Sequence, residues 1–353
     1  RDKACEHPDK ACHGESCPLA QGFYDRLPAA RSAALDNGAA LDQATLRSVA
    51  LEHQVCPYYL GQELARWADV VVGDYHHYFD AGGLLHGLTQ ANDWRVALLV
   101  DEAHNLLERA RSMYSVTLRP EHLSRARQSP TAQQSQPVRQ ALARVGRAWV
   151  AHDKALDNAQ GPHYQVHEHF PPKLLAALQQ ALNTLAEHQV EHPSDNDPAL
   201  LDFQFEALQL GRLLEQFGPH SMVDTSPGPA ASPVAGQSVL CLRNLVPAHF
   251  LRARFASVHS ATLFSATLSP GHYHADLLGL PLVCPRQTEA AALGAALQAA
   301  WSLGRESGAG ESLEALCRRC VALDESTRTQ PQARQQAAYE QAYRRYLEHL
   351  PPR

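Results

Sequence analysis

The stretch "WRVALLVDEAHNLLERA", residues 94–110, places two adjacent acids directly after a short apolar run. The run from Val96 to Val100 is continuous rather than alternating, which is typical of a strand buried on both faces of a parallel sheet. Open α/β sheets bind ligands beyond the carboxyl ends of such strands, and Asp101 and Glu102 stand there. An acidic pair can also cap the helix that follows it. The apolar strand before the pair and His104 after it favour a ligand site.

The composition sets limits on the class of protein. The chain has 353 residues, of which 44% are hydrophobic and 19% charged, enough for two or three domains with cores. With a net charge of −6, a nucleic-acid partner would have to meet a local basic surface. No apolar run approaches the roughly 20 residues that span a bilayer, and no signal peptide is evident, so we expect a cytoplasmic protein with reduced cysteines. Because the sequence starts at Arg1 rather than Met, we expect it to begin partway into a longer protein.

Eight cysteines fall into an early and a late group. The early group could close a four-cysteine site around zinc or an iron–sulfur cluster, and its spacing does not choose between them. This group consists of Cys5, Cys12, Cys17 and Cys56. His7 and His13 could replace a thiol as ligands, but we interpret both as solvated loop residues. Cys317 and Cys320 have no second pair and lie in a helical pattern, so we expect two buried or half-buried thiols.

The apolar pattern divides the chain into segments. Residues 18–55 have the spacing of two helices, which would return Cys56 to the first three cysteines. The apolar run from Val70 to Val72 predicts a short strand. Residues 119–240 have apolar positions at i, i+3, i+4 and i+7, which predicts a helical insertion. After a Pro, Gly and Ser linker at 226–237 the strand pattern returns in "SVLCLRNL", so we expect one α/β domain whose sheet is interrupted by the insertion.

Two stretches could contact nucleic acid. The first part of the insertion, from Arg119 to Lys154, holds seven Arg or Lys residues. Such a run is usually a solvated helix face, and a nucleic-acid surface is the alternative. The stretch "GFYDRLPAAR" beside the early cysteines offers aromatic faces for bases and guanidinium groups for phosphates. We expect Phe23 to pack inside the protein, and we interpret Arg26 and Arg31 as phosphate contacts.

Four features, taken in order, resemble the iron–sulfur helicases of superfamily 2, the DinG/XPD group. They are the early cysteines ending in "CPYYLGQELARWADVVVGDYHHYFD", the VDEAHNL motif, the helical insertion and "LFSATLSP". The resemblance covers about residues 1–280. It implies an α/β fold, namely an incomplete RecA-like motor domain with an inserted iron–sulfur domain and a helical arch domain, and a role on single-stranded or forked DNA, as in DNA repair.

The resemblance also implies domain limits. Residues 1–62 would be the iron–sulfur domain, and residues 63–118 with 238–280 would be part of motor domain 1. Residues 119–237 would be the arch-like insertion. Residues 281–353 would be a separate, helical C-terminal segment. We expect a monomer with no membrane contact.

Roles for individual residues follow from the same resemblance. The early cysteines would ligate a [4Fe–4S] cluster, which leaves both histidines out. In the complete enzyme, Asp101 would hold the Mg²⁺ that accompanies ATP, and Glu102 would be the catalytic base. His104 would connect these acids to a neighbouring motif, in which Ser265 and Thr267 couple hydrolysis to DNA movement.

Two departures limit what this chain is expected to do. No G-x-x-x-x-G-K-[ST] phosphate loop occurs in the sequence, and no second motor domain follows SATLSP, so we expect no ATP hydrolysis or unwinding by this chain alone. From about residue 276, "ADLLGLPLVCPRQTEAAALGAALQAAW" and the rest resemble the C-terminal end of xylulose kinases of the FGGY family. We therefore interpret the chain as a helicase fragment joined to a sugar-kinase fragment. The alternatives are a non-catalytic module that binds single-stranded DNA and a xylulose kinase remnant.

Overall fold

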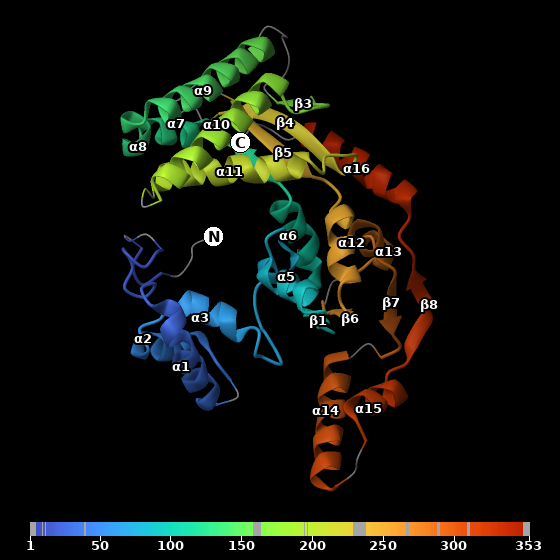
Figure 1. The fold of residues 1–353 in the computed structure, drawn as a ribbon. Helices are drawn as coiled ribbons and strands as arrows, with labels where there is room; N and C mark the ends of the chain where they lie inside the picture. The colour runs from blue at the N-terminus through green and yellow to red at the C-terminus, as the bar shows by residue number, and fades with distance from the viewer. Residues whose placement is uncertain are drawn as a thin grey trace.

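The computed structural model describes residues 5–8, 10, 12–38, 40–157, 164–193, 195, 197–228, 238–265, 268–287, 290–308 and 311–348. These residues form a mixed α/β protein in which helices predominate (Figure 1). The described strands form three small sheets, of two, four and two strands. The α/β class expected from the sequence is therefore correct.

The N-terminal helices form a unit with a core of its own. They are α1 (Phe23–Asp36), α2 (Gln43–Glu52) and α3 (Pro57–Leu64). Asp42 caps α2, because its carboxylate accepts a hydrogen bond from the Thr45 amide at 2.8 Å. The small core consists of Ala30, Ala34, Val49, Ala50, Val55, Leu60 and Leu64. The two helices predicted within residues 18–55 are confirmed, and Cys56 is the N-cap of α3.

The central part contains a two-stranded parallel sheet flanked by helices. Strand β1 (Ala97–Val100) pairs with β6 (Ser260–Leu263), with Val100 opposite Leu263. The surrounding helices are α4 (His76–Phe79), α5 (Leu84–Ala91), η1 (Ala103–Asn105), α6 (Leu106–Met113), α12 (Ala248–Ala256) and α13 (Gly271–Leu278). The parallel strand predicted at 96–100 is confirmed.

Two expectations about this sheet are wrong. Strand β1 is not buried on both faces: Val100 is 2% exposed, but Leu99, on the opposite face, is 68% exposed, because no described residue covers its side chain. Residues 70–72 form no strand and lie exposed. The apolar run at 96–100 therefore forms a strand, whereas the run at 70–72 does not. An apolar run alone does not supply the neighbouring strand to which it must hydrogen-bond.

The insertion combines helices with an antiparallel sheet. Its helices are α7 (Pro120–Gln128), α8 (Pro130–Gln134), α9 (Gln136–Asp157), α10 (Pro172–Glu191) and α11 (Pro198–Leu214). The sheet has the strand order β2-β5-β4-β3. Strands β4 (Ser221–Pro227) and β3 (Gln165–His167) lie within residues 119–237, whereas β2 (Val116–Leu118) and β5 (Ser238–Asn244) lie just outside these expected limits of the insertion. The buried Trp149 of α9 donates to the carbonyl of Ser238 at 2.9 Å, which fastens the helix to the sheet.

The strand "SVLCLRNL" therefore belongs to a different sheet from the one expected. It forms β5, which pairs antiparallel with β4 along seven residues and with β2 on its other side, and not with β1. The physical reason is that β4 and β5 are close in sequence and can pair locally, whereas joining the parallel sheet would require a crossover.

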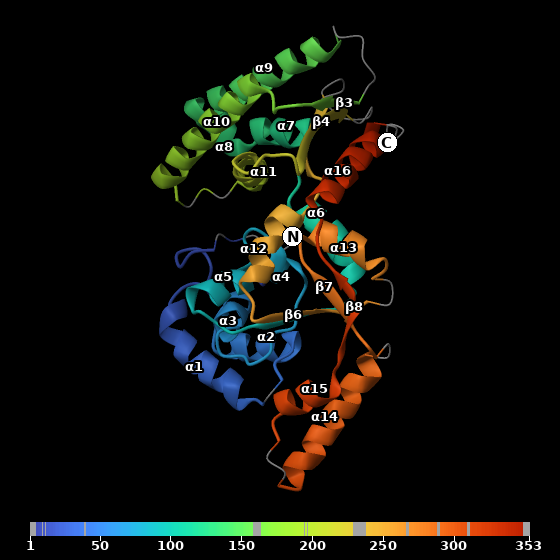
Figure 2. The ribbon, with the colours of Figure 1, turned by 90° about the vertical axis from the view of Figure 1, so that its right-hand side faces the viewer.

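The C-terminal segment is helical, as expected, but also contributes two strands. They are β7 (Leu282–Pro285) and β8 (Leu323–Thr329), which pair antiparallel. The helices are α14 (Ala290–Glu306), α15 (Leu313–Cys320) and α16 (Ala333–Glu348). Figure 2 shows α14 and α15 projecting away from the other elements, whereas α16 lies beside α13. Cys317 is half-buried on α15, but Cys320 is exposed, so the expectation of two at least half-buried thiols is wrong for Cys320.

None of the helices that the structure describes combines the length and the apolar composition needed to cross a bilayer.

Candidate functional site

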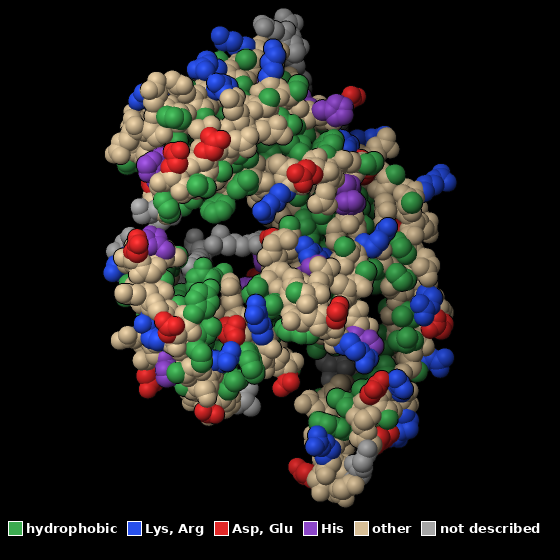
Figure 3. Space-filling view, viewed as in Figure 1, with side chains coloured by type: hydrophobic (Ala, Val, Ile, Leu, Met, Phe, Trp, Pro, Cys, Tyr) green, Lys and Arg blue, Asp and Glu red, His purple; other side chains and the backbone are tan. Residues whose placement is uncertain are grey.

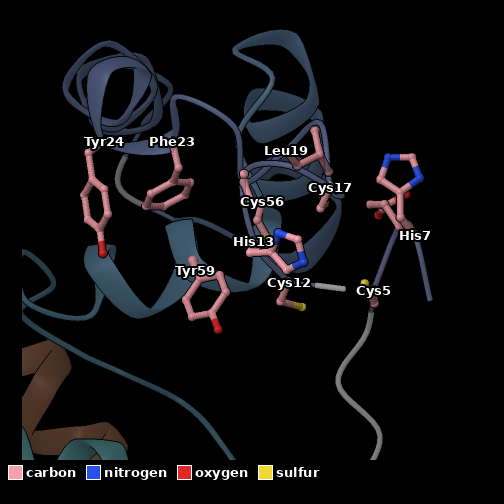
Figure 4. Close-up of a pocket in the computed structure, with 13 residues that line it drawn as sticks. Cys5, His7, Cys12, His13, Cys17, Leu19, Phe23, Tyr24, Cys56 and Tyr59 are labelled. Carbon is pink, nitrogen blue, oxygen red and sulfur yellow. The ribbon is translucent and has the colours of Figure 1, made fainter. Parts of the chain in front are cut away.

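All four early cysteines line one cavity, of about 350 Å³, beside the N-terminal helices (Figure 4). Cys17 is buried, Cys5 and Cys56 are half-buried, and Cys12 is exposed. Cys17 is held in a tight turn, because its amide donates to the carbonyl of His13 at 2.9 Å. Helix α3 begins directly after Cys56, so the packing of the N-terminal helices brings this distant thiol to the others.

The donors of this cavity suit an iron–sulfur cluster. Its other walls include the apolar side chains of Leu19, Ala20 and Phe23, which limit access of water to a bound group. Among the described residues, no three His, Cys, Asp or Glu side chains stand close enough together to hold one metal ion. In a cluster each thiolate binds a different iron atom, so the four ligands stand further apart than those of a single zinc ion. The four thiols that line the cavity match the number of ligands that such a cluster needs.

Two histidines share the cavity. Both His7 and His13 line it. The Nε2 atom of His13 is buried and has no hydrogen-bond partner within the described part of the chain. The interpretation of His13 as a solvated loop residue is therefore wrong, and its imidazole is a further possible donor beside the thiols.

Exposed aromatic rings border the cysteine cavity. Tyr24 is 83% exposed, and Tyr58 and Tyr59, two and three residues after Cys56, are also exposed. Phe23 packs edge-on against Tyr24 and Tyr59 and contacts the small helical core, as expected. Figure 4 shows the rings of Tyr24 and Tyr59 at one side of the cavity and Cys5 at the other. Tyr58 and Tyr59 were not predicted as site residues, although their position close to Cys56 in the sequence could have indicated that they border the cysteine site.

The two arginines predicted to contact DNA both have partners inside the protein. Arg26 donates to the backbone carbonyls of Gln21, Gln54 and Pro18, and so ties the cysteine loop to the end of α2. Arg31 lies 3.0 Å from Glu63 Oε1, and its guanidinium stacks over the Trp67 ring at 4.6 Å. Their role as phosphate contacts stays a prediction.

The adjacent acids lie at the carboxyl end of the parallel sheet. Past the last residues of β1 and β6, the pairing continues through the Phe264 amide, which donates to the Val100 carbonyl at 2.8 Å. The Ala103 amide donates to the Phe264 carbonyl at the same distance. These bonds place Asp101 and Glu102 at one edge of the sheet, where both are exposed.

Tyr75, which was not among the predicted site residues, supports the turn that carries the two acids. The Tyr75 hydroxyl donates to the carbonyls of Asp101 and Glu102, the latter at 2.9 Å. Burial, and then the negative charge of Asp101, raise the pKa of Tyr75, so the hydroxyl stays protonated as a donor. Asp74 and Arg109 also lie near this hydroxyl. No local pattern identifies this support, because it joins two loops that are 26 residues apart.

The histidine after the acids connects the two strand ends. His104 Nδ1 lies 2.9 Å from Ser265 Oγ and 3.2 Å from Glu102 Oε2. The structure thus brings together four of the predicted site residues: Asp101, Glu102, His104 and Ser265. Thr267, predicted to act with Ser265, lies outside the described residues.

The strand-end acids fit part of a magnesium nucleotide site. Mg²⁺ is usually held in proteins by one or two carboxylates together with waters and substrate phosphates. Asp101 offers such an exposed carboxylate, one oxygen of which accepts from the Glu102 amide at 2.8 Å. The phosphate loop that would hold the nucleotide is absent from the sequence.

A basic, polar cavity lies on the helical insertion. Its volume is about 330 Å³, and Arg127 and Arg139 line it together with Gln128 and Gln133. Exposed basic residues continue along α9. Figure 3 shows Lys and Arg side chains close together at the upper end of this helix. The basic residues between Arg119 and Lys154 therefore lie largely on the surface. Both predicted roles, a solvated helix face and a nucleic-acid surface, require this.

Comparison with protein families identifies the N-terminal part of the chain. Residues 1–123, which include the early cysteines and the strand-end acids, match the model of the DEAD_2 family. This segment is a DEAD_2 domain. The predicted resemblance to the DinG/XPD helicases is thereby confirmed for the DEAD_2 domain.

Similarities beyond the DEAD_2 domain are partial. A 76-residue segment is 45% identical to the xylulose kinase of Haemophilus influenzae, which confirms the second predicted resemblance. The match covers 22% of this chain and 14% of that kinase. Among solved structures, "XPD_Helicase" matches with 16% identity and a TM-score of 0.42, over 77% of this chain and 47% of the other. "Truncated XPD" matches with 17% identity and a TM-score of 0.41, over 67% and 62%. The chain thus spans less than half of one helicase structure and a small part of the kinase.

Proposed function

We propose that this chain is part of an iron–sulfur DNA helicase and that its N-terminal unit carries a [4Fe–4S] cluster which helps to bind single-stranded DNA. Residues 1–62 are then the cluster domain, residues 63–118 and 238–280 belong to the first motor domain, and residues 119–237 are the arch-like insertion. Cys5, Cys12, Cys17 and Cys56 are the cluster ligands.

One observation carries the proposal: four cysteines, distant in sequence, line one cavity that is bordered by exposed tyrosines. A cluster bound there would join the loop before α1 to the start of α3, and so would stabilise the unit. The rings of Tyr24 and Tyr59 offer faces on which unpaired bases can stack. The match of residues 1–123 to the DEAD_2 family supports the same assignment.

The strand-end site has a matching role in the complete enzyme. Asp101 holds Mg²⁺, Glu102 accepts a proton from the attacking water, and ATP supplies the phosphoryl group. The 2.9 Å contact between His104 and Ser265 supports a role for this pair in relaying the state of the nucleotide site to the neighbouring strand. Hydrolysis then requires a phosphate loop, which this sequence does not contain, so the chain alone acts as a DNA-binding segment.

The cluster is tested by anaerobic purification. We expect brown protein with about four iron and four sulfide ions per chain. Cys17→Ser should lose most of the iron, because the buried thiolate cannot be replaced by an alcohol of similar size. The matched control is Cys320→Ser, which makes the same change at an exposed cysteine outside the cavity and should keep the iron.

Two results would contradict the proposal. Colourless protein with one zinc ion would replace the cluster by a structural zinc site. Equal iron loss in His13→Ala and Cys17→Ser would make the imidazole a ligand and would remove one of the four cysteines from the set.

A further inference from the structure

A second polar cavity, of about 390 Å³, lies where α6, β2, β5 and α11 meet, and it shares no lining residue with the cysteine cavity or with the strand-end acids. Three guanidinium groups face it, from Arg111, Arg119 and Arg243. The C-terminal helix α16 contributes one wall through Tyr343, whose ring lies 4.9 Å from the Arg111 guanidinium carbon. The cavity therefore combines cationic groups from three parts of the chain.

Two of the three arginines are balanced by acids, and the third is not. Arg243 donates to both carboxylate oxygens of the buried Asp224. Arg111 lies 3.5 Å from Glu108, but this acid is 78% exposed, where an ion pair contributes little. Arg119 forms no ion pair with any residue that the structure describes. The positive charge of Arg119 is thus available to a ligand.

The remaining acid of the cavity, Glu206, is partly neutralised by its burial. Burial raises the pKa of Glu206 to about 7, so near neutral pH this carboxyl holds a proton about half of the time. Its Oε1 atom lies 2.6 Å from His122 Nδ1, and burial lowers the pKa of that histidine. At neutral pH Glu206 therefore carries only part of a negative charge, and the three arginines leave the net charge facing the cavity positive.

Neutral hydrogen-bond donors complete the walls. Ser112 contributes a hydroxyl. Gln209 Nε2 already donates to the carbonyls of Met113 and Ser115, at 3.4 and 3.3 Å, and the Thr117 hydroxyl lies 3.3 Å from Cys241 Sγ. The hydroxyl of the neighbouring Ser115 is already engaged, since it donates to the Arg111 carbonyl at 2.6 Å and accepts from the Asn244 amide at 2.9 Å. A wall that combines guanidinium groups with the Ser112 hydroxyl suits an oxyanion rather than an apolar ligand or a metal cation.

We propose that this cavity binds a phosphate group, with Arg119 and Arg111 as its cationic contacts. The volume leaves room for the atoms attached to the phosphate, so the source is either a small phosphorylated molecule or the backbone of a nucleic acid. This site is separate from the cysteine cavity and from the strand-end acids, and it does not depend on their proposed roles.

The test measures binding of inorganic phosphate to the full chain by titration calorimetry at constant ionic strength. We expect saturable binding that Arg119→Gln weakens about tenfold, since one charge-assisted contact is lost. Arg119→Lys should recover part of the affinity, because it keeps the charge. Arg252→Gln, an exposed arginine on α12 outside the cavity, is the matched control and should bind as the unchanged protein does.

A second arm distinguishes the two sources. A short oligothymidine is titrated against the unchanged chain and Arg119→Gln, with and without excess inorganic phosphate. Loss of affinity in the variant together with competition by phosphate assigns the site to a nucleic-acid backbone, whereas phosphate binding without any effect on the oligonucleotide assigns it to a small ligand. If Arg119→Gln and Arg252→Gln bind both probes as the unchanged chain does, or if neither probe binds, the proposal is wrong.

Discussion

Glu102 adopts a left-handed backbone with a φ of 46°, although it is not glycine. Such a conformation costs about 1 kcal/mol and persists where neighbouring groups enforce it. Here the Tyr75 hydroxyl donates to the carbonyls of Asp101 and Glu102. The Ala103 amide donates to the Phe264 carbonyl. The turn thereby leaves both carboxylates exposed, directly before the short helix η1.

The raised pKa of the partly buried Glu206 predicts how the stability of the protein depends on pH. Its pKa is about 7 in the folded protein and 4.5 as the reference for the unfolded chain, so the folded state binds more protons between these values. The stability it contributes is present below pH 4.5 and is lost as the pH rises through about 7. Glu206→Gln cannot titrate. We measure the free energy of unfolding of Glu206→Gln minus that of the unchanged chain, and we expect this difference to rise by up to about 3 kcal/mol between pH 5 and pH 8.

The measurement is urea unfolding at a series of pH values. Glu187→Gln, an exposed acid on α10, is the control and should give a constant difference. A constant difference for Glu206→Gln as well would show that burial does not raise the pKa of this carboxyl.

Individual site residues were predictable where the signal was local. The two acids follow a recognisable strand, and the cysteines stand out by residue type, so both groups were found from sequence. Tyr75 was not found, because its role depends on a contact with a turn far along the chain. Glu206 was missed for a similar reason: it looks like any surface acid in a helical pattern until α7 packs against α11.

At the scale of elements, strongly periodic helices were predicted well and strand partners were not. α10 and α11 follow their apolar spacing, with buried residues on one side. β5 was predicted as a strand but assigned to the wrong sheet, and the pairing of β7 with β8 was not predicted. Strand pairing depends on which other strands are within reach, and periodicity carries no information about that.

Helix α16 is fastened to the central part by polar and aromatic contacts. The buried Asp276 of α13 accepts from the Gln332 amide at 2.6 Å and so satisfies a donor at the start of α16. Tyr339 packs edge-on against Tyr273 at 5.3 Å, and Arg344 donates to the Ser221 carbonyl at 2.7 Å. The C-terminal helix is therefore part of the same folded body as the main core.

Loss of one aromatic contact should measure this attachment. We expect Tyr339→Ala to lower the free energy of unfolding by about 2 kcal/mol, less than for a fully buried aromatic residue because Tyr339 is only partly buried. Tyr24→Ala removes the same atoms from an 83% exposed position and should change stability by less than about 0.5 kcal/mol. Urea unfolding followed by circular dichroism compares the two variants. Equal stability would mean that α16 does not pack on the body.

For the whole molecule, the net charge of −6 requires that any DNA contact be local. The candidate surfaces are the tyrosines at the cysteine cavity and the basic face of the insertion, one for bases and one for phosphates. A single strand that met both would join the N-terminal helices to the insertion across the molecule.

This arrangement predicts salt-dependent binding with an aromatic contribution. Affinity for an oligothymidine should fall as salt rises, with each phosphate contact adding about −0.7 to the log–log slope. Tyr24→Ala should weaken binding about tenfold at every salt concentration, because it removes stacking rather than charge. Trp301→Ala on α14 is the control, and iron content should be unchanged in both variants. Affinity that does not respond to salt, or equal affinity of the two variants, would contradict this arrangement.

The sparse sheet of β1 and β6 has a consequence for how the protein can be handled. Within the described residues, the outer backbone row of each strand has no strand partner, and Leu99 on β1 is exposed. Unpaired rows with apolar neighbours are templates on which another strand can add. At the millimolar concentrations of spectroscopy or crystallisation, self-association through this edge then competes with the dispersed state. A charged substitution such as Leu99→Lys is a direct way to oppose it.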